Sequence, residues 1–222
     1  MQDLLTVLIP VLLADVVNPV LFAFMVYAVG TERPLLNANA VLLGHTAAYL
    51  AFGIGLAFAY DAISERLGNP EPMDFVISLV IGLVLLWFAW KTARGSATGG
   101  ATPEVARLTP LKAFVTGAIV NAIGIPFALP YFAAIDQVLK ADLSITQSVM
   151  VLAGYNLAYA LPFLIVPGLV LVLGDAGRPI LIRINEKLDR ISAYLMPILL
   201  GLVGGALVAD ASHYFVVGEG LW

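Results

Sequence analysis

Long apolar runs, separated by short polar or glycine- and proline-containing stretches, follow one another along the chain. A helix needs about 20 mostly apolar residues to cross a membrane, and these runs do not alternate apolar and polar residues as barrel strands would. The pattern predicts an all-α integral membrane protein. We expect six transmembrane helices, at Leu4–Val29, Ala38–Tyr60, Phe75–Lys91, Leu111–Val138, Val149–Leu173 and Tyr194–Ala209.

The first and fourth runs contain helix-breaking residues. The first has "DVVNPV" (15–20), with Pro19, and the fourth has "NAIGIPFALP" (121–130), with Pro126 and Pro130. A proline inside a helix frees a carbonyl four residues back, and in hydrocarbon such a carbonyl is tolerated only where protein or water satisfies it. We therefore predict that helices 1 and 4 are broken at these prolines and face each other across an interior cavity.

The chain also repeats itself. "LLGHTAAY" (42–49) matches "LAGYNLAY" (152–159) 110 residues later, and "VLFAF" (20–24) meets "PYFAA" (130–134) at the same offset. "IGLV" (81–84) aligns with "LGLV" (200–203) at an offset nine residues larger than that of the other two matches. An insertion of nine residues in the second copy would account for the difference.

Each repeat has three predicted helices, so the second copy would enter the membrane from the opposite side. Such inverted repeats are common in secondary transporters, whose sites lie at the midplane where broken helices meet. The predicted organisation is residues 1–92 as the first three-helix repeat, 93–110 as a flexible cytoplasmic linker rich in glycine, alanine, serine and threonine, and 111–222 as the second repeat.

Basic residues gather on one side of this predicted topology. Nine of the eleven lysines and arginines lie in loops on one side, and only Arg66 and Lys140 lie on the other. The positive-inside rule places the side with nine in the cytoplasm. Both termini then face outward, and we expect the plasma (inner) membrane of a bacterium or archaeon. The cytoplasmic group is Arg33, Lys91, Arg94, Arg107, Lys112, Arg178, Arg183, Lys187 and Arg190.

The segment at about 178–192 alternates apolar and charged residues at helical spacing. Such a pattern is typical of an amphipathic helix at the membrane interface. We expect one on the cytoplasmic side before the last membrane span, with a bracing role favoured over lipid sensing.

Composition narrows the function classes. Of the 222 residues, 61% are hydrophobic, 12% are charged and none is cysteine, which excludes disulfide exchange, thiolate metal sites and iron–sulfur clusters. No dense basic face points to nucleic acid. The N-terminus lacks a basic segment and a small-residue cleavage site, so we expect the first helix to be retained. No cofactor or metal is predicted; the expected partners are the lipid bilayer and a small-molecule or ion substrate, and a homodimer is compatible with the sequence.

Asp15 is the foremost candidate site residue, because it is a carboxylate well inside a predicted span. An acid there is costly to insert and is by default a functional hypothesis. It can exchange a proton during transport. The alternative is a hydrogen-bonded structural role. His45, in the second predicted span, could relay a proton or make an interhelical hydrogen bond.

Polar residues near the predicted mid-span complete the candidate pathway. Carboxamides can satisfy broken backbone and contact a substrate or cation, although helix packing is the more common role. Tyr49 and Tyr159 are repeat-related, as are Gly44 and Gly154, which we expect to let the second and fifth helices approach closely. The candidate pathway residues are Asp15, Asn18, Pro19, His45, Asn121, Pro126, Pro130, Asn156 and Tyr159.

Six spans in two inverted halves, with "NPVLF" in the first helix and "PFALP" in the fourth, resemble the LysE superfamily. Within it the nearest patterns are the CcdA and DsbD transmembrane electron carriers, with P-C-x-x-P-like motifs in helices 1 and 4, and the GAP-type small exporters. The run "NPVLFAFMVYAVGTERPLLNANAVLLGHTAAY" (18–49) is similar to the latter.

The chain departs from the CcdA pattern where chemistry would occur. Val20 follows Pro19 and Phe127 follows Pro126, where the electron carriers have cysteine. Thiol redox transfer is therefore excluded, and the resemblance implies transport.

We interpret the sequence as a secondary transporter or exporter of a small solute or ion, with alternating access around a midplane site on helices 1 and 4, which Asp15 can couple to protons. The alternative is a non-transporting membrane scaffold or assembly partner with a CcdA-like fold. An enzyme is disfavoured, because the chain has no H-E-x-x-H, no paired intramembrane aspartates and no G-x-S-x-G.

Overall fold

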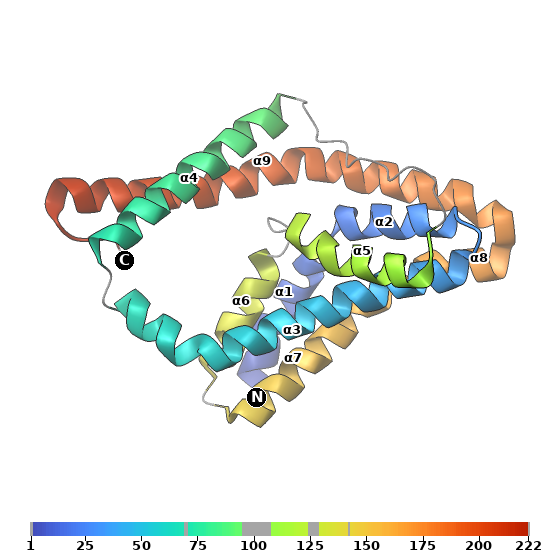
Figure 1. Cartoon of the computed structure of the whole chain (residues 1–222), viewed down its shortest axis with the longest axis horizontal. Helices are drawn as coiled ribbons and strands as arrows, with labels where there is room; N and C mark the ends of the chain where they lie inside the picture. The colour runs from blue at the N-terminus through green and yellow to red at the C-terminus, as the bar shows by residue number, and fades with distance from the viewer. Residues whose placement is uncertain (1, 69–70, 95–107, 124–128, 142, 222) are drawn as a thin grey trace. The chain divides into compact units, whose positions relative to one another are not determined.

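The computed structural model describes residues 2–68, 71–94, 108–123, 129–141 and 143–221, and all regular structure in these segments is helical (Figure 1). The prediction of an all-α chain is thus confirmed. The helices are α1 (Gln2–Asp15), α2 (Pro19–Val29), α3 (Pro34–Gly68), α4 (Pro72–Ala93), α5 (Pro110–Ile123), α6 (Leu129–Leu139), α7 (Ile145–Ala160), the 3₁₀ turn η2 (Leu161–Leu164), α8 (Ile165–Leu173), the 3₁₀ turn η3 (Gly174–Ala176) and α9 (Gly177–Val217).

Several of these helices are long and apolar enough to cross a membrane. Within the described residues the segments are Pro34–Ala59, Pro72–Ala93 and the helical run Ile145–Val217, and the pair Leu4–Asp15 and Pro19–Val29 adds a fourth if it counts as one bent span. The chain therefore has the helices of a membrane protein. The six separate spans stay a prediction, because the middle of the fourth, residues 124–128, lies outside the description.

The break in helix 1 lies where the sequence predicts it. α1 ends at Asp15 and α2 starts at Pro19, and the two helices are bent by 53°. Pro19 occupies the first position of α2, where a missing N–H costs no hydrogen bond. In the fourth predicted helix, α5 ends at Ile123 and α6 begins at Leu129, and Pro126 lies outside the described residues.

The segment predicted as a separate amphipathic helix is instead the first part of α9. α9 is 41 residues long and contains Pro197. Neither glycine nor proline occurs between Pro179 and Pro197 to end the helix after the amphipathic segment. Leu181 is fully buried and Ile184 and Leu188 pack on the core, so the apolar stripe is present.

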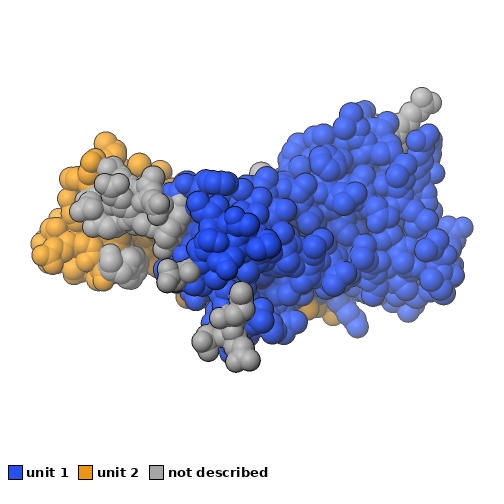
Figure 2. Space-filling model, turned by 90° about the horizontal axis from the view of Figure 1, so that it is seen from below, with its two compact units in different colours: residues 1–60, 102–189 blue, residues 61–101, 190–222 orange. Residues whose placement is uncertain are grey.

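The chain divides into two compact units, which do not coincide with the two sequence repeats (Figure 2). Unit 1 consists of Met1–Tyr60 and Thr102–Asp189, and unit 2 of Asp61–Ala101 and Arg190–Trp222. Most of the predicted linker, residues 95–107, lies outside the described part of the chain.

In unit 1 the helices α1 and α2 pack crosswise on α5 and α6. α1 lies along α6, whereas α2 packs against α5 and α8 (Figure 1). α3 crosses α5 in direct backbone contact at Gly44 and Gly117, where a methyl group on either glycine would overlap a carbonyl group of the other helix. The close approach predicted for Gly44 is therefore to α5, and Gly154 has no heavy atom near its absent side chain.

Unit 2 is built on a second glycine contact. A Cβ atom on Gly82 of α4 would lie 2.9 Å from the Gly204 carbonyl oxygen of α9, and one on Gly204 would lie 2.8 Å from the Gly82 oxygen. At the same helix pair the rings of Phe75 and Tyr214 stack, with their centroids 3.7 Å apart. Small residues at such crossings let membrane helices gain van der Waals contact.

Gly82→Ala is expected to lower the free energy of unfolding by about 1–2 kcal/mol, because the added methyl group would push α4 away from α9. Gly205→Ala is the matched control, since no heavy atom lies within 4 Å of that position. Thermal unfolding in detergent would measure both, and equal midpoints for the two variants would contradict the packing role of Gly82.

Candidate functional site

The break between α1 and α2 exposes backbone groups that a side chain then satisfies. Asn18 has extended backbone angles and caps α2, because its Oδ1 atom accepts the Leu21 N–H at 2.9 Å. Pro19 has no N–H for the carbonyl of Asp15, four residues back. The sequence thus ends one helix on a carboxylate and starts the next on a carboxamide, both inside the protein.

Asp15 is buried and bonded by two tyrosines. Its side chain is 1% exposed, and it accepts the Tyr49 hydroxyl at 3.1 Å and the Tyr155 hydroxyl at 2.9 Å, one on each oxygen. Among the described residues it has no lysine or arginine partner. A bare carboxylate in such surroundings is costly, so Asp15 is suited to carrying a proton or meeting a cation.

A second set of hydrogen bonds joins Asn18, Tyr159 and His45. Asn18 Nδ2 donates to the Tyr159 hydroxyl at 3.1 Å, and that hydroxyl lies 3.2 Å from His45 Nε2. Because the Asn18 oxygen accepts the Leu21 N–H, its nitrogen faces Tyr159. The Tyr159 hydroxyl either donates to His45 Nε2 or accepts from it, according to the tautomer of the histidine.

His45 Nδ1 is buried and has no hydrogen-bond partner among the described residues. Three side-chain oxygens of the site or of neighbouring residues are also buried without a hydrogen-bond partner among the described residues: Thr46 Oγ1, Asn121 Oδ1 and Asn156 Oδ1. Buried polar atoms in proteins usually have a hydrogen-bond partner, so these four atoms are exceptions. These atoms can therefore bond a solute or a water molecule that reaches the site.

Stacked aromatic rings connect the hydrogen bonds of Asp15 with those of Asn18, Tyr159 and His45. The Tyr49 ring stacks on Tyr131 at 4.1 Å between centroids and lies 5.2 Å from the Tyr159 ring and 4.9 Å from the His45 ring. Asn156 Nδ2 donates to the Tyr131 hydroxyl at 2.8 Å. The rings fill the space between α3, α6 and α7 and help to keep Asp15 from solvent.

Most of the candidate residues come together here. Asp15, Asn18, His45, Asn156 and Tyr159 belong to the network, and Pro19 sets the break that positions the first two. Pro130 is half-buried at the start of α6, next to Tyr131, and Pro126 lies outside the described residues.

Asn121, a candidate pathway residue in the fourth predicted helix, makes no hydrogen bond to Asp15 within the described part of the chain. Its Nδ2 atom donates to the His45 carbonyl at 3.1 Å and to the Ala118 carbonyl at 3.3 Å. The hydrogen-bond partners of Asp15 come from α3 and α7, not from the fourth predicted helix. Asn121 therefore supports the backbone that carries His45.

Sequence reasoning missed the roles of Tyr49, Tyr131 and Tyr155. A signal was present: His45 and Tyr49 are four residues apart, Tyr155 and Tyr159 are four apart, and the two pairs are related by the 110-residue repeat. Residues four apart share a helix face, so each repeat places two polar aromatic side chains on one face. A buried acid nearby needs such donors.

Comparison with known proteins gives one result. The model of the family SfLAP, described as "Sap, sulfolipid-1-addressing protein", matches residues 8–213. Neither a curated protein nor a solved structure matches the chain.

Proposed function

The chain belongs to the SfLAP family, and from this premise we propose that it is a secondary transporter that moves a lipid-like amphiphile across a bacterial or archaeal plasma membrane. The family description names a sulfolipid, which supports an anionic lipid-like solute over an inorganic ion. The apolar helices support a membrane location.

The proposed architecture has six spans in two inverted halves, with both termini outside. Its support is the crosswise packing in unit 1, where α1 lies along α6 and α2 packs against α5. Two broken helices that run antiparallel about a pseudo-two-fold axis would pair in this way. The distribution of basic residues supports the orientation.

The observation that carries the proposal is the buried carboxylate of Asp15 at the break of helix 1, bonded by Tyr49 and Tyr155. Broken helices with intramembrane ionisable groups mark substrate and proton pathways in many transporters. A structural brace would be served by a neutral amide, whereas an acid adds the ability to gain and lose charge.

The hydrogen bonds suggest how charge would act. When Asp15 is protonated, its neutral carboxyl group fits the closed aromatic cluster. Loss of the proton leaves a charge that two hydroxyl donors stabilise incompletely, which favours a state in which water reaches the break. The cycle would alternate between these states, with the solute moving when the cluster opens.

Among the described residues no continuous chain of hydrogen bonds joins His45 to Asp15, and the contact between Tyr49 and Tyr159 is one of tilted rings with centroids 5.2 Å apart. In this state His45 fixes Tyr159 and, through it, Asn18. A proton relay through His45 would operate only after Tyr159 turns, so relay and opening would be linked.

The purified protein in liposomes tests the proposal. Translocation of a fluorescent phosphatidylglycerol between leaflets is expected to be at least about tenfold faster with protein than without, and to respond to an imposed pH gradient. A chemical quencher added outside measures the translocated fraction. Protein-free vesicles are the control, and a phosphatidylcholine probe reports charge selectivity.

Translocation no faster than in protein-free vesicles would contradict the proposal and favour the alternative, a non-transporting membrane scaffold. Fast translocation whose rate does not change with the pH gradient would support transport and contradict proton coupling.

A further inference from the structure

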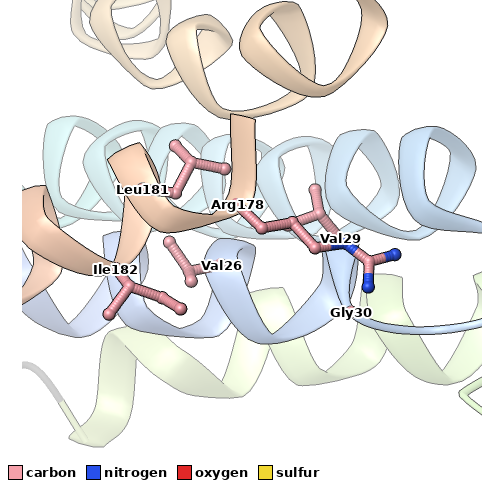
Figure 3. Close-up of a pocket in the computed structure, with 6 residues that line it drawn as sticks. All are labelled: Val26, Val29, Gly30, Arg178, Leu181 and Ile182. Atoms are coloured by element: carbon pink, nitrogen blue, oxygen red, sulfur yellow. The ribbon is translucent and has the colours of Figure 1, made fainter. Parts of the chain in front are cut away.

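A small groove lies between the end of α2 and the beginning of α9, and no residue of the aromatic cluster lines it (Figure 3). It has a volume of about 140 Å³ and is lined by Val26, Val29, Gly30, Arg178, Leu181 and Ile182. Five of the six residues are apolar, and Ile182 is 51% exposed, so the groove reaches the surface. A cavity of about 150 Å³ holds a benzene-sized apolar group, which makes this space sufficient for a short stretch of acyl chain.

Arg178 supplies the one charge of the groove. Figure 3 shows its aliphatic stem beside Val29 and its guanidinium group at Gly30. Its ion pair is a single contact from Nε to Asp175 at 3.5 Å, and the Asp175 side chain is 94% exposed. Within the described chain no other acid pairs with this arginine. The rest of its planar fork, which suits a phosphate or sulfate group, is free to bind a ligand.

The surroundings favour an anionic lipid. Arg178 stands near the start of α9, on the side predicted to face the cytoplasm, and Arg33 follows Gly30 by three residues. Basic groups near a membrane surface attract anionic headgroups. An apolar slot with an arginine at its edge therefore matches both parts of one molecule, the chain and the headgroup.

We propose that the groove between α2 and α9 binds one anionic membrane lipid, with its headgroup on Arg178 and the start of an acyl chain between Val26, Leu181 and Ile182. Each methylene that leaves water strengthens such binding about fourfold. The lipid would bridge the second half of broken helix 1 and α9. This site is separate from the transport proposed above and does not depend on it, because binding is measured without translocation.

The test uses the purified full chain in detergent, titrated with phosphatidylglycerol or with phosphatidylcholine of the same acyl chains. Native mass spectrometry counts bound lipid, and thermal unfolding reports stabilisation. Phosphatidylglycerol is expected to bind more tightly, and Arg178→Gln is expected to lower that preference about fivefold, as the loss of one basic contact does near a membrane surface. Arg178 is exposed enough for the variant to fold, and its unfolding midpoint without lipid checks this.

Arg183→Gln is the matched control, because Arg183 lies on the same helix and does not line the groove. An equal loss in Arg183→Gln would mean general attraction to a basic surface and would overturn the site. Equal binding of the two lipids by the unchanged protein would overturn it as well. An Arg178-dependent stabilisation by inorganic phosphate alone, with no added effect of lipid, would identify a free-anion site in place of the lipid site.

Discussion

Asp15→Asn is expected to abolish the pH dependence of translocation in reconstituted vesicles and to slow translocation driven by a pH gradient at least about tenfold. The amide has the shape of the acid and can still accept one tyrosine hydroxyl through Oδ1 while donating to the other through Nδ2. It cannot release a proton, so the charge at the break stays at zero. Folding is expected to be retained, as judged by gel filtration and the thermal midpoint.

Two comparisons make this result specific. Asp136→Asn removes an acid of α6 whose side chain is 43% exposed and pairs with Lys140, and it is expected to leave the pH profile unchanged. Asp15→Ala removes both acceptors and leaves the hydroxyls of Tyr49 and Tyr155 buried without partners, which is expected to cost about 2–4 kcal/mol of stability.

A pH profile of Asp15→Asn that matches the unchanged protein would refute the coupling role. Failure of both the asparagine and the alanine variants to fold would assign Asp15 a purely structural role.

Gly44→Ala is expected to destabilise unit 1 by about 3 kcal/mol or more. The new Cβ atom would overlap the carbonyl oxygen of Phe114 and lie 2.8 Å from its carbonyl carbon. Helix backbones cannot yield as a flexible side chain can, so α3 and α5 would have to separate. That movement would also disturb His45, which is next in sequence and whose carbonyl accepts Asn121 from α5.

Gly154→Ala is the control for Gly44→Ala, because the two glycines occupy the same position in the two repeats and nothing lies within 4 Å of Gly154. Its thermal midpoint is expected to stay the same or to rise slightly, since alanine favours a helix more than glycine by about 1 kcal/mol. Similar losses in the two variants would show that glycine is needed for a reason other than the crossing with α5.

Local chemistry was enough to predict an all-helical chain and the break in its first predicted membrane helix, but not the 3₁₀ turn η2 that divides the fifth predicted helix into α7 and α8. Long apolar runs favour helices whatever surrounds them, and Pro19 interrupts the helical run because it has no N–H to give to the Asp15 carbonyl, so that it starts the next helix. Asn18 beside it is a common cap. Asp15 was a candidate for a similar reason, because a carboxylate in an apolar run is costly in any fold.

Only the tertiary structure decided which groups meet. The tyrosines that bond Asp15, the partner of Gly44 in α5 and the support of His45 by Asn121 all join segments more than 30 residues apart. A hydropathy pattern shows which residues avoid water. In a bilayer, however, an apolar helix face can be covered by lipid as well as by another helix, so the pattern does not show which helices are neighbours. The choice of partner therefore depends on shape and hydrogen bonding between helices, which become defined only when the helices are packed.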